Sequence, residues 1–213
     1  MSVKQHEAYC LNSFQKQLFF YEDFLGDSLR DLWTVAFSAG GSVSVIDAQD
    51  GGICRLATDA DNLDAAYISW GNIRSLHVNK KVTIEIRAKL VRITNIETEL
   101  ALYYDVNNQV WFQYVESAGG AADNWDLKSE NGGAITTADS GIAADANYHI
   151  YRIECFPAAI HFYIDDVECN NSPITTNIPS DAADYLQPYI YLRNRAGVAS
   201  SLDVDYMVVR QDV

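Results

Sequence analysis

The sequence is short of positive charge and of cysteine. Its 213 residues include 15 Lys and Arg against 29 Asp and Glu, which gives a formal net charge of −14. Such an acidic chain repels phosphate groups, and this excludes nucleic acid as a partner. The four cysteines contain no C-x-x-C pair, so the spacing typical of a zinc cluster is missing. We interpret all four as free and mostly buried thiols: Cys10, Cys54, Cys155 and Cys169.

Two further absences concern membranes and secretion. No apolar run approaches the roughly 20 residues that a membrane-spanning helix needs. The opening stretch MSVKQHEAYCLNSFQ has no basic segment followed by an apolar one, so a cleavable secretion signal is not expected. We therefore expect no membrane insertion and synthesis in the cytoplasm. A chain that leaves the cell would need another route, such as virion assembly followed by lysis.

What the sequence does contain is a pattern of short strands. In VTIEIRAKL (82–90) apolar Ile84 and Ile86 alternate with charged Glu85 and Arg87, as expected for a half-buried strand. Clusters of Gly, Asn and Asp interrupt the chain roughly every ten residues, which is typical of a β-sandwich or barrel. They read SAGGS, QDGG, DVNN, SAGGAADN and ENGG.

The same pattern predicts one β domain over residues 20–213. Residues 1–19 precede it and are expected to form an N-terminal arm or a short helix, since residues 2–20 lack Gly and Pro. A second stretch, 179–186, has the composition for one helical turn. No internal repeat or linker divides the rest.

Three segments carry a resemblance to a known fold. Residues 146–168, ANYHIYRIECFPAAIHFYIDDVE, resemble a hairpin of the concanavalin-A-like lectin and glucanase jelly rolls. Residues 188–211 are similar to the closing strands of those families, and residues 21–35 resemble the opening of laminarinase-type glucanases. The resemblance implies an all-β, two-sheet antiparallel jelly-roll sandwich whose concave sheet offers a groove to a sugar chain.

The resemblance also raises the question of catalysis. Retaining glycosidases need two carboxylates about 5–5.5 Å apart. Laminarinase-type enzymes carry theirs on one strand, in a Glu-x-Asp-x-Glu run. The equivalent strand by this resemblance is 107–117, NNQVWFQYVES, where Gln109, Trp111 and Gln113 would face the groove. An amide can be neither nucleophile nor proton donor, so we expect the chain not to be an enzyme.

Candidate ligand contacts follow from the same comparison. Each has a purely structural interpretation beside it: the tryptophans would simply pack, His149 would be a hydrogen-bonded structural residue, and Arg87 would pair with Glu85 on a solvated face. The resemblance assigns Trp33 to the core. The expected groove residues are Trp111, Gln109, Gln113, Trp125, Trp70, His149 and Arg87.

No cofactor is required by the sequence, but the resemblance implies a possible site for structural calcium. Asp205 in DVDY matches one of the family's calcium positions, and Glu22 or Asp23 lies near another. Carboxylate oxygens are the ligands that calcium prefers.

A second resemblance suggests where such a module would work. Residues 124–179 are similar to a pattern in tailed-phage structural proteins, with Asn-Trp, Gly-Gly and Thr-Thr followed by Tyr-His and Asn-x-Pro. It predicts a non-catalytic virion module, for head decoration or tail attachment, with weak binding of cell-surface glycans. Partners would be other virion proteins or further copies, as a trimer if residues 1–19 are exchanged. The alternatives are a stand-alone lectin-like protein and, third, a glycan hydrolase or lyase.

Overall fold

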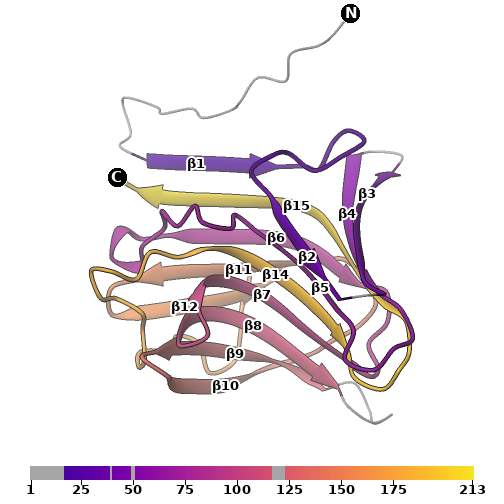
Figure 1. The fold of residues 1–213 in the computed structure, drawn as a ribbon. Helices are drawn as coiled ribbons and strands as arrows, with labels where there is room; N and C mark the ends of the chain where they lie inside the picture. Colours follow the sequence, from indigo (N-terminus) through magenta and orange to yellow (C-terminus); the bar gives the residue numbers. More distant parts are fainter. Residues whose placement is uncertain (1–16, 39, 49–50, 117–122) are drawn as a thin grey trace, which may run out of the picture.

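The computed structural model describes residues 17–38, 40–48, 51–116 and 123–213. Within them the regular structure is β-strand apart from one short 3-10 helix, η1 (Val78–Lys80). No described helix is long and apolar enough to cross a membrane. The strands form two antiparallel sheets that face each other (Figure 1). This confirms the predicted all-β, two-sheet sandwich.

The first sheet has eight strands. Its longest strand, β15, pairs with β6 along one side, and along its other side with β4 in its first part and β1 in its second. In spatial order the strands are β13 (Val167–Glu168), β12 (Ala159–Ile164), β11 (His149–Phe156), β6 (Thr83–Leu90), β15 (Ser200–Asp212), β4 (Gly51–Thr58) and β3 (Ser42–Ala48), with β1 (Gln17–Glu22) beside β15.

The second sheet has seven strands, and β7 lies at its centre. Consecutive hairpins build one half, from β7 through β8 and β9 to β10, while β14 returns from the far end of the sequence to pair with β7. In spatial order the strands are β10 (Ala134–Ala143), β9 (Asn124–Asn131), β8 (Asn108–Glu116), β7 (Ile96–Asp105), β14 (Gln187–Asn194), β5 (Ala65–Ser69) and β2 (Thr34–Phe37).

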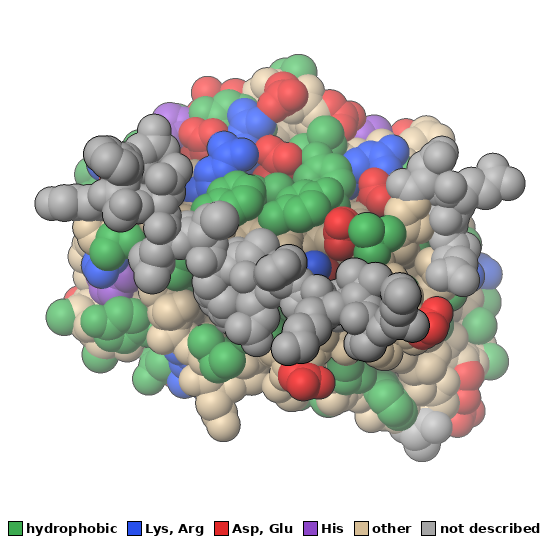
Figure 2. Space-filling view, turned by 90° about the horizontal axis from the view of Figure 1, so that it is seen from above, with side chains coloured by type: hydrophobic (Ala, Val, Ile, Leu, Met, Phe, Trp, Pro, Cys, Tyr) green, Lys and Arg blue, Asp and Glu red, His purple; other side chains and the backbone are tan. Residues whose placement is uncertain are grey.

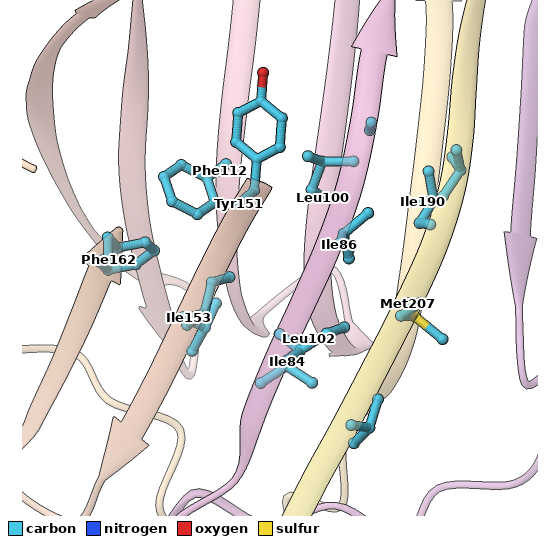
Figure 3. Packing of buried hydrophobic residues seen from close by; sticks show 14 of the residues in the cluster. Ile84, Ile86, Leu100, Leu102, Phe112, Tyr151, Ile153, Phe162, Ile190 and Met207 are labelled. Atoms are coloured by element: carbon cyan, nitrogen blue, oxygen red, sulfur yellow. The ribbon is translucent and has the colours of Figure 1, made fainter. Parts of the chain in front are cut away.

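Alternation of side chains determines which residues form the core. On β6, Ile84 and Ile86 are buried, whereas Glu85 and Arg87 point away from the core, as their spacing predicts. The two inner faces meet in one apolar layer, where Ile86 of the first sheet lies near Leu100 of the second and Ile84 lies near Leu102 (Figure 3). Burial of this layer is the main favourable contribution to folding.

Aromatic rings join the two sheets. Phe112 on β8 makes edge-to-face contacts with Tyr151 on β11 and Phe162 on β12, at ring-centroid distances of 5.5 and 5.2 Å (Figure 3). Edge-to-face pairs place the positive ring edge against the negative ring face, which adds to the gain from burial. The contacts fix how β8 sits over the hairpin of β11 and β12.

The structure bears on the predictions for the N-terminal residues, for the stretch 179–186 and for the cysteines. Residues 17–19, expected in the arm, are part of β1, while residues 1–16 lie outside the described residues. The stretch 179–186 forms turns and no helix. Cys54, Cys155 and Cys169 are free and buried as predicted, and Cys10 lies outside the described residues.

Candidate functional site

The strand β7 carries polar side chains on the outward face of the seven-stranded sheet. Leu100 and Leu102 point into the core, so Glu97, Glu99 and Tyr103 point the other way. The neighbouring strand β8 continues this face, because Glu99 pairs with Gln113 in the register. The centre of this sheet therefore presents carboxylates and an amide on its outward side.

The prediction for β8 is confirmed as to which residues share a face. Phe112 and Tyr114 are buried in the core, and Gln109, Trp111 and Gln113 lie on the opposite side. The adjacent strand β7 adds Glu97 and Glu99 to this face, so the lack of carboxylates on β8 does not extend to the face as a whole.

The two carboxylates lie side by side. The Nε2 atom of Gln113 donates to Oε1 of Glu99 at 3.0 Å and to Oε1 of Glu97 at 3.4 Å. The other oxygen of Glu97 accepts from Nε of Arg193 and from Nη1 of Arg195, both at 3.1 Å. Glu97 is therefore paired with two guanidinium groups, whereas Glu99 has only the amide as a direct hydrogen-bond partner among the described residues.

Burial raises the pKa of Glu99 to about 7. The charge of Glu97 adds to the increase, while the Gln113 hydrogen bond and the positive charges of Lys128 and Arg193 act against it. Close to neutral pH this side chain can therefore be either a hydrogen-bond donor or an acceptor. Its neighbour Glu97 remains paired with arginine.

Glu99 leads to a testable pH dependence of stability. Its ordinary pKa is 4.5 and its folded-state pKa is about 7, so between these values the folded chain binds more protons than the unfolded chain. The free energy of unfolding should therefore fall as the pH rises from about 4.5 through 7. Glu99→Gln should flatten this decline, measured as melting temperature against pH. Parallel curves for the two proteins would contradict the raised pKa of Glu99. The pKa of His149 is also raised, but His149 is present in both proteins and so does not contribute to the difference between them.

Four tyrosines adjoin the carboxylates. Tyr103 stacks on Tyr189 with ring centroids 4.7 Å apart, and Tyr67 and Tyr191 contact Tyr189 at 5.3 and 6.1 Å. All four are half-buried, so each keeps part of its ring exposed. Burial raises the pKa of Tyr191 to about 12, so its phenol is neutral and can donate a hydrogen bond at physiological pH.

We refer to this surface as the glutamate–tyrosine face. The tyrosines come from β5, β14 and β7, the acidic and amide groups from β7 and β8, and the basic groups from β9 and β14. Its members are Tyr67, Glu97, Glu99, Tyr103, Gln113, Lys128, Tyr189, Tyr191 and Arg193.

Two of the predicted groove residues lie on this side of the sheet but are covered. Trp111 is 3% exposed and Gln109 is 8% exposed. Gln109 donates to Glu130 at 3.1 Å, and the ammonium of Lys128 lies 5.9 Å from the Trp111 ring centroid. Trp111 offers no open ring for stacking, so Gln113 is the predicted residue that belongs to the exposed site.

Two other predicted contacts are core residues. Trp125 is 2% exposed and packs on Tyr151 at 4.7 Å; Trp70 is 5% exposed and packs on Phe20 at 5.0 Å. Both stand at inward positions of their strands or turns, which corrects the expectation that they face a ligand. Trp33 is buried, as predicted.

His149 and Arg87 belong to the eight-stranded sheet and so lie away from the glutamate–tyrosine face. His149 lies between Asp145, at 2.9 Å, and Asp165, and these partners raise its pKa although burial lowers it. Arg87 pairs with Asp205. This corrects the expectation that the two residues face the groove. The structural interpretation fits the contacts of His149, and Arg87 has Asp205 as its ion-pair partner in place of Glu85.

The two carboxylates proposed for calcium have other partners. Glu22 is buried and accepts from the Trp33 indole at 3.0 Å and from the Phe24 amide at 3.1 Å, with Arg30 at 3.4 Å. Asp205 forms an ion pair with Arg87. The described residues contain no group of three or more acidic, His or Cys side chains suited to a metal ion. These contacts do not fit a calcium site. Calcium binding therefore stays a prediction from the family resemblance.

Comparison with known proteins gives the fold. No family model matches the chain, and no curated protein matches it in sequence. Solved structures do match. A β-glucanase from Bacillus licheniformis superposes with a TM-score of 0.64 at 18% identity, over 92% of this chain and 98% of the other. A pseudo β-1,3-glucanase of Mycobacterium tuberculosis gives 0.67 at 15% identity, over 91% and 98%.

The fold is the glucanase jelly roll. A protein of unknown function from Shewanella oneidensis shares it, with a TM-score of 0.69 at 8% identity over 93% of this chain and 88% of the other. At these identities the likeness establishes the concanavalin-A-like architecture alone. Activity has to be argued from the residues of the glutamate–tyrosine face.

That face contains residues that the sequence reasoning missed. Glu97 and Glu99 alternate with Thr98, Leu100 and Leu102 in IETELAL, and this period of two is itself the signal that places both carboxylates on one side. The tyrosines could not be found in this way. They come from strands that are distant in the sequence and adjacent only in the sheet.

Proposed function

We propose that this chain is a glycan-binding protein that holds a sugar chain on its glutamate–tyrosine face. The observation that carries the proposal is the cluster of four half-buried tyrosines next to Glu99, which in turn accepts a hydrogen bond from Gln113. Aromatic surfaces bind the apolar faces of sugar rings, and carboxylates and amides hydrogen-bond the ring hydroxyls. Ligand sites are typically lined by apolar and aromatic groups together with a few polar groups that fix the orientation of the ligand, and this face has both kinds.

The structural neighbours support this class of ligand. The matching structures include a β-glucanase, a pseudo β-1,3-glucanase and a mixed-linkage glucan GH16 protein of Bacteroides ovatus in complex with the product G4G4G3G. Linear β-glucans are therefore the first ligands to test. The shared fold places an outward-facing sheet where such a chain can lie.

We propose binding without hydrolysis, for two reasons. A glycosidic nucleophile needs a free carboxylate, and Glu97 is already engaged by two arginines and an amide. The laminarinase-type run Glu-x-Asp-x-Glu has acidic residues at three alternate positions, whereas three alternate positions on β7 hold Glu97, Glu99 and Ala101. Alanine cannot transfer a proton.

One observation favours hydrolysis as a second candidate. Glu99, with a pKa raised to about 7, stands beside Glu97, and glycosidases use two neighbouring carboxylates. Release of reducing ends from β-1,3-glucan and mixed-linkage glucan, abolished by Glu99→Gln, would establish it. Binding without release would leave the non-catalytic proposal standing.

Binding is tested with a glycan array that includes both β-glucans, followed by titration with the best ligand. Tyr103→Ala should weaken binding about tenfold, because one stacking ring contributes about 1–1.5 kcal/mol. Tyr163→Ala is the matched control. Tyr163 is also half-buried but lies on β12 of the other sheet, where it stacks on His161.

Equal losses in both tyrosine variants would contradict a site on the glutamate–tyrosine face. So would an array with no bound glycan for a folded protein. Circular dichroism on each variant separates loss of binding from loss of structure.

The biological setting is a further part of the proposal. We place the module on a virus particle, on the strength of the resemblance of residues 124–179 to tailed-phage structural proteins. There a weak individual affinity would be multiplied by many copies. Immunogold labelling of purified particles with an antibody to this chain tests the placement, and label confined to the particle-free fraction would contradict it.

A further inference from the structure

Strand β1 lies at a border of the eight-stranded sheet. It pairs with β15 from Gln17 opposite Asp212 to Glu22 opposite Met207, and β15 is its one partner strand within the described part of the chain. In Figure 1 it forms the upper border of the sandwich, with no coloured strand above it. The N–H and C=O groups along its other side therefore point away from the sheet.

Such an edge is normally protected. Natural edges carry lysine, proline or a bulge, or are covered by another part of the chain. Two other borders of this protein are covered by the chain itself: the Asn170 amide donates to the Ser140 carbonyl on β10, and the Ile174 and Ile160 backbones pair beside β12. The sequence of β1, QLFFYE, has no lysine, proline or bulge, and its one inward-pointing charge, Glu22, stands at the last position of the strand.

The outward side of β1 is aromatic. Phe19 is 39% exposed and Tyr21 is 41% exposed. Arg210 lies over the Phe19 ring at 5.7 Å, and the Tyr21 and Tyr206 rings are 6.4 Å apart. Figure 2 views the molecule from above this border and shows hydrophobic side chains next to basic ones. An edge strand with aromatic side chains of this kind is suited to pairing with another strand.

We propose that the β1 edge pairs in antiparallel fashion with β1 of a second copy, about a two-fold axis. Within the described part of the chain the backbone groups on this side of β1 have no partner strand, so another strand suits them as occupant, and a two-fold axis brings an antiparallel copy of the same strand to the edge. The result is one continuous sheet across both copies. The inference is independent of glycan binding.

The alternation of side chains restricts the register of this pairing. Residues opposite each other in an antiparallel pair point to the same side of the sheet, so outward Phe19 must face an outward residue of the second copy. Two registers pair five residues of each strand: Phe19 opposite Phe19, or Phe19 opposite Tyr21. Either one creates aromatic pairs across the interface, with Phe20 remaining on the core side.

The test is the mass of the full chain in solution, by size-exclusion chromatography with light scattering over a range of concentrations. We expect twice the chain mass for the natural sequence and the single-chain mass for the double variant Phe19→Lys, Tyr21→Lys. Lysines beside an edge keep it solvated and repel a second copy. Phe156→Lys is the matched control: Phe156 is 37% exposed on the same sheet but lies on β11, and this variant should remain dimeric.

Cysteine cross-linking in a Cys10→Ser background tests the pairing independently, because a gained cross-link cannot be explained by a variant that fails to fold. A disulfide-linked dimer of the Phe19→Cys variant alone supports pairing with Phe19 opposite Phe19. A disulfide-linked dimer that forms only when Phe19→Cys and Tyr21→Cys chains are mixed supports pairing with Phe19 opposite Tyr21. A monomer at every concentration overturns the proposal. A monomer that dimerises only after deletion of residues 1–16 also overturns it, since those residues would then occupy the edge. A trimer lost on that deletion would instead favour exchange of the N-terminal arm.

Discussion

Replacement of Trp125 by alanine is expected to lower the free energy of unfolding by about 3–5 kcal/mol, the range for large aromatic residues removed from a core. The indole is 2% exposed and contacts the rings of Phe112, Tyr114 and Tyr151. These rings come from both sheets, so the cavity would open where the sheets meet. Urea denaturation followed by circular dichroism measures the change.

The same variant distinguishes a core residue from a ligand contact. Glycan affinity per folded molecule should stay unchanged in Trp125→Ala, because the ring lies on the inner side of β9. Trp125→Phe, with a smaller cavity, provides a folded sample if the alanine variant is too unstable. Unaltered stability together with lost glycan binding would instead show that Trp125 contacts the ligand.

Glu22→Ala is expected to cost about 3 kcal/mol of stability, because it leaves buried donors without an acceptor. The carboxylate is 2% exposed, and it accepts from the Trp33 indole and the Phe24 amide while pairing with Arg30. Thermal melting of the variant and the natural sequence measures the loss. The melting temperature should not respond to calcium or to a chelator in either protein.

Asp205→Asn is the control for the Glu22 experiment. Its ion pair with Arg87 is partly exposed on both sides, so its loss should cost no more than about 1 kcal/mol. A melting temperature that rises with calcium in the natural sequence, and fails to rise in either variant, would establish the metal site expected from the family resemblance. In that case the hydrogen bonds of Glu22 would be the arrangement of the metal-free form.

The candidate site was recoverable from the sequence only in part. The period of two in NQVWFQYVE correctly placed Gln113 on the face opposite Phe112, and the same rule applied to IETELAL places Glu97 beside Glu99 on one side. Alternation did not reveal that Trp111 would be covered. Exposure of a side chain depends on what the neighbouring strands and loops place over it, and one strand's pattern carries no such information.

The contacts of the site are set by distant parts of the chain. Gln113 reaches Glu99 across a hairpin, 14 residues away in sequence, whereas Arg193 reaches Glu97 from 96 residues away. Short-range pairings follow from consecutive hairpins and can be guessed. The return of β14 to the centre of the sheet cannot, because many strand orders satisfy the same alternation.

The sequence by itself determined the strands, the one-domain sandwich, the buried thiols and the two faces of β6 and β8. These are local consequences of alternating polarity and of turn residues, which act within a few positions along the chain. Tertiary structure decided that Trp125 and Trp70 face the core, that His149 and Arg87 belong to the other sheet, and that β1 pairs with β15 alone among the described strands. Strand order and the choice of inner face arise from packing two whole sheets against each other, so no single segment encodes them.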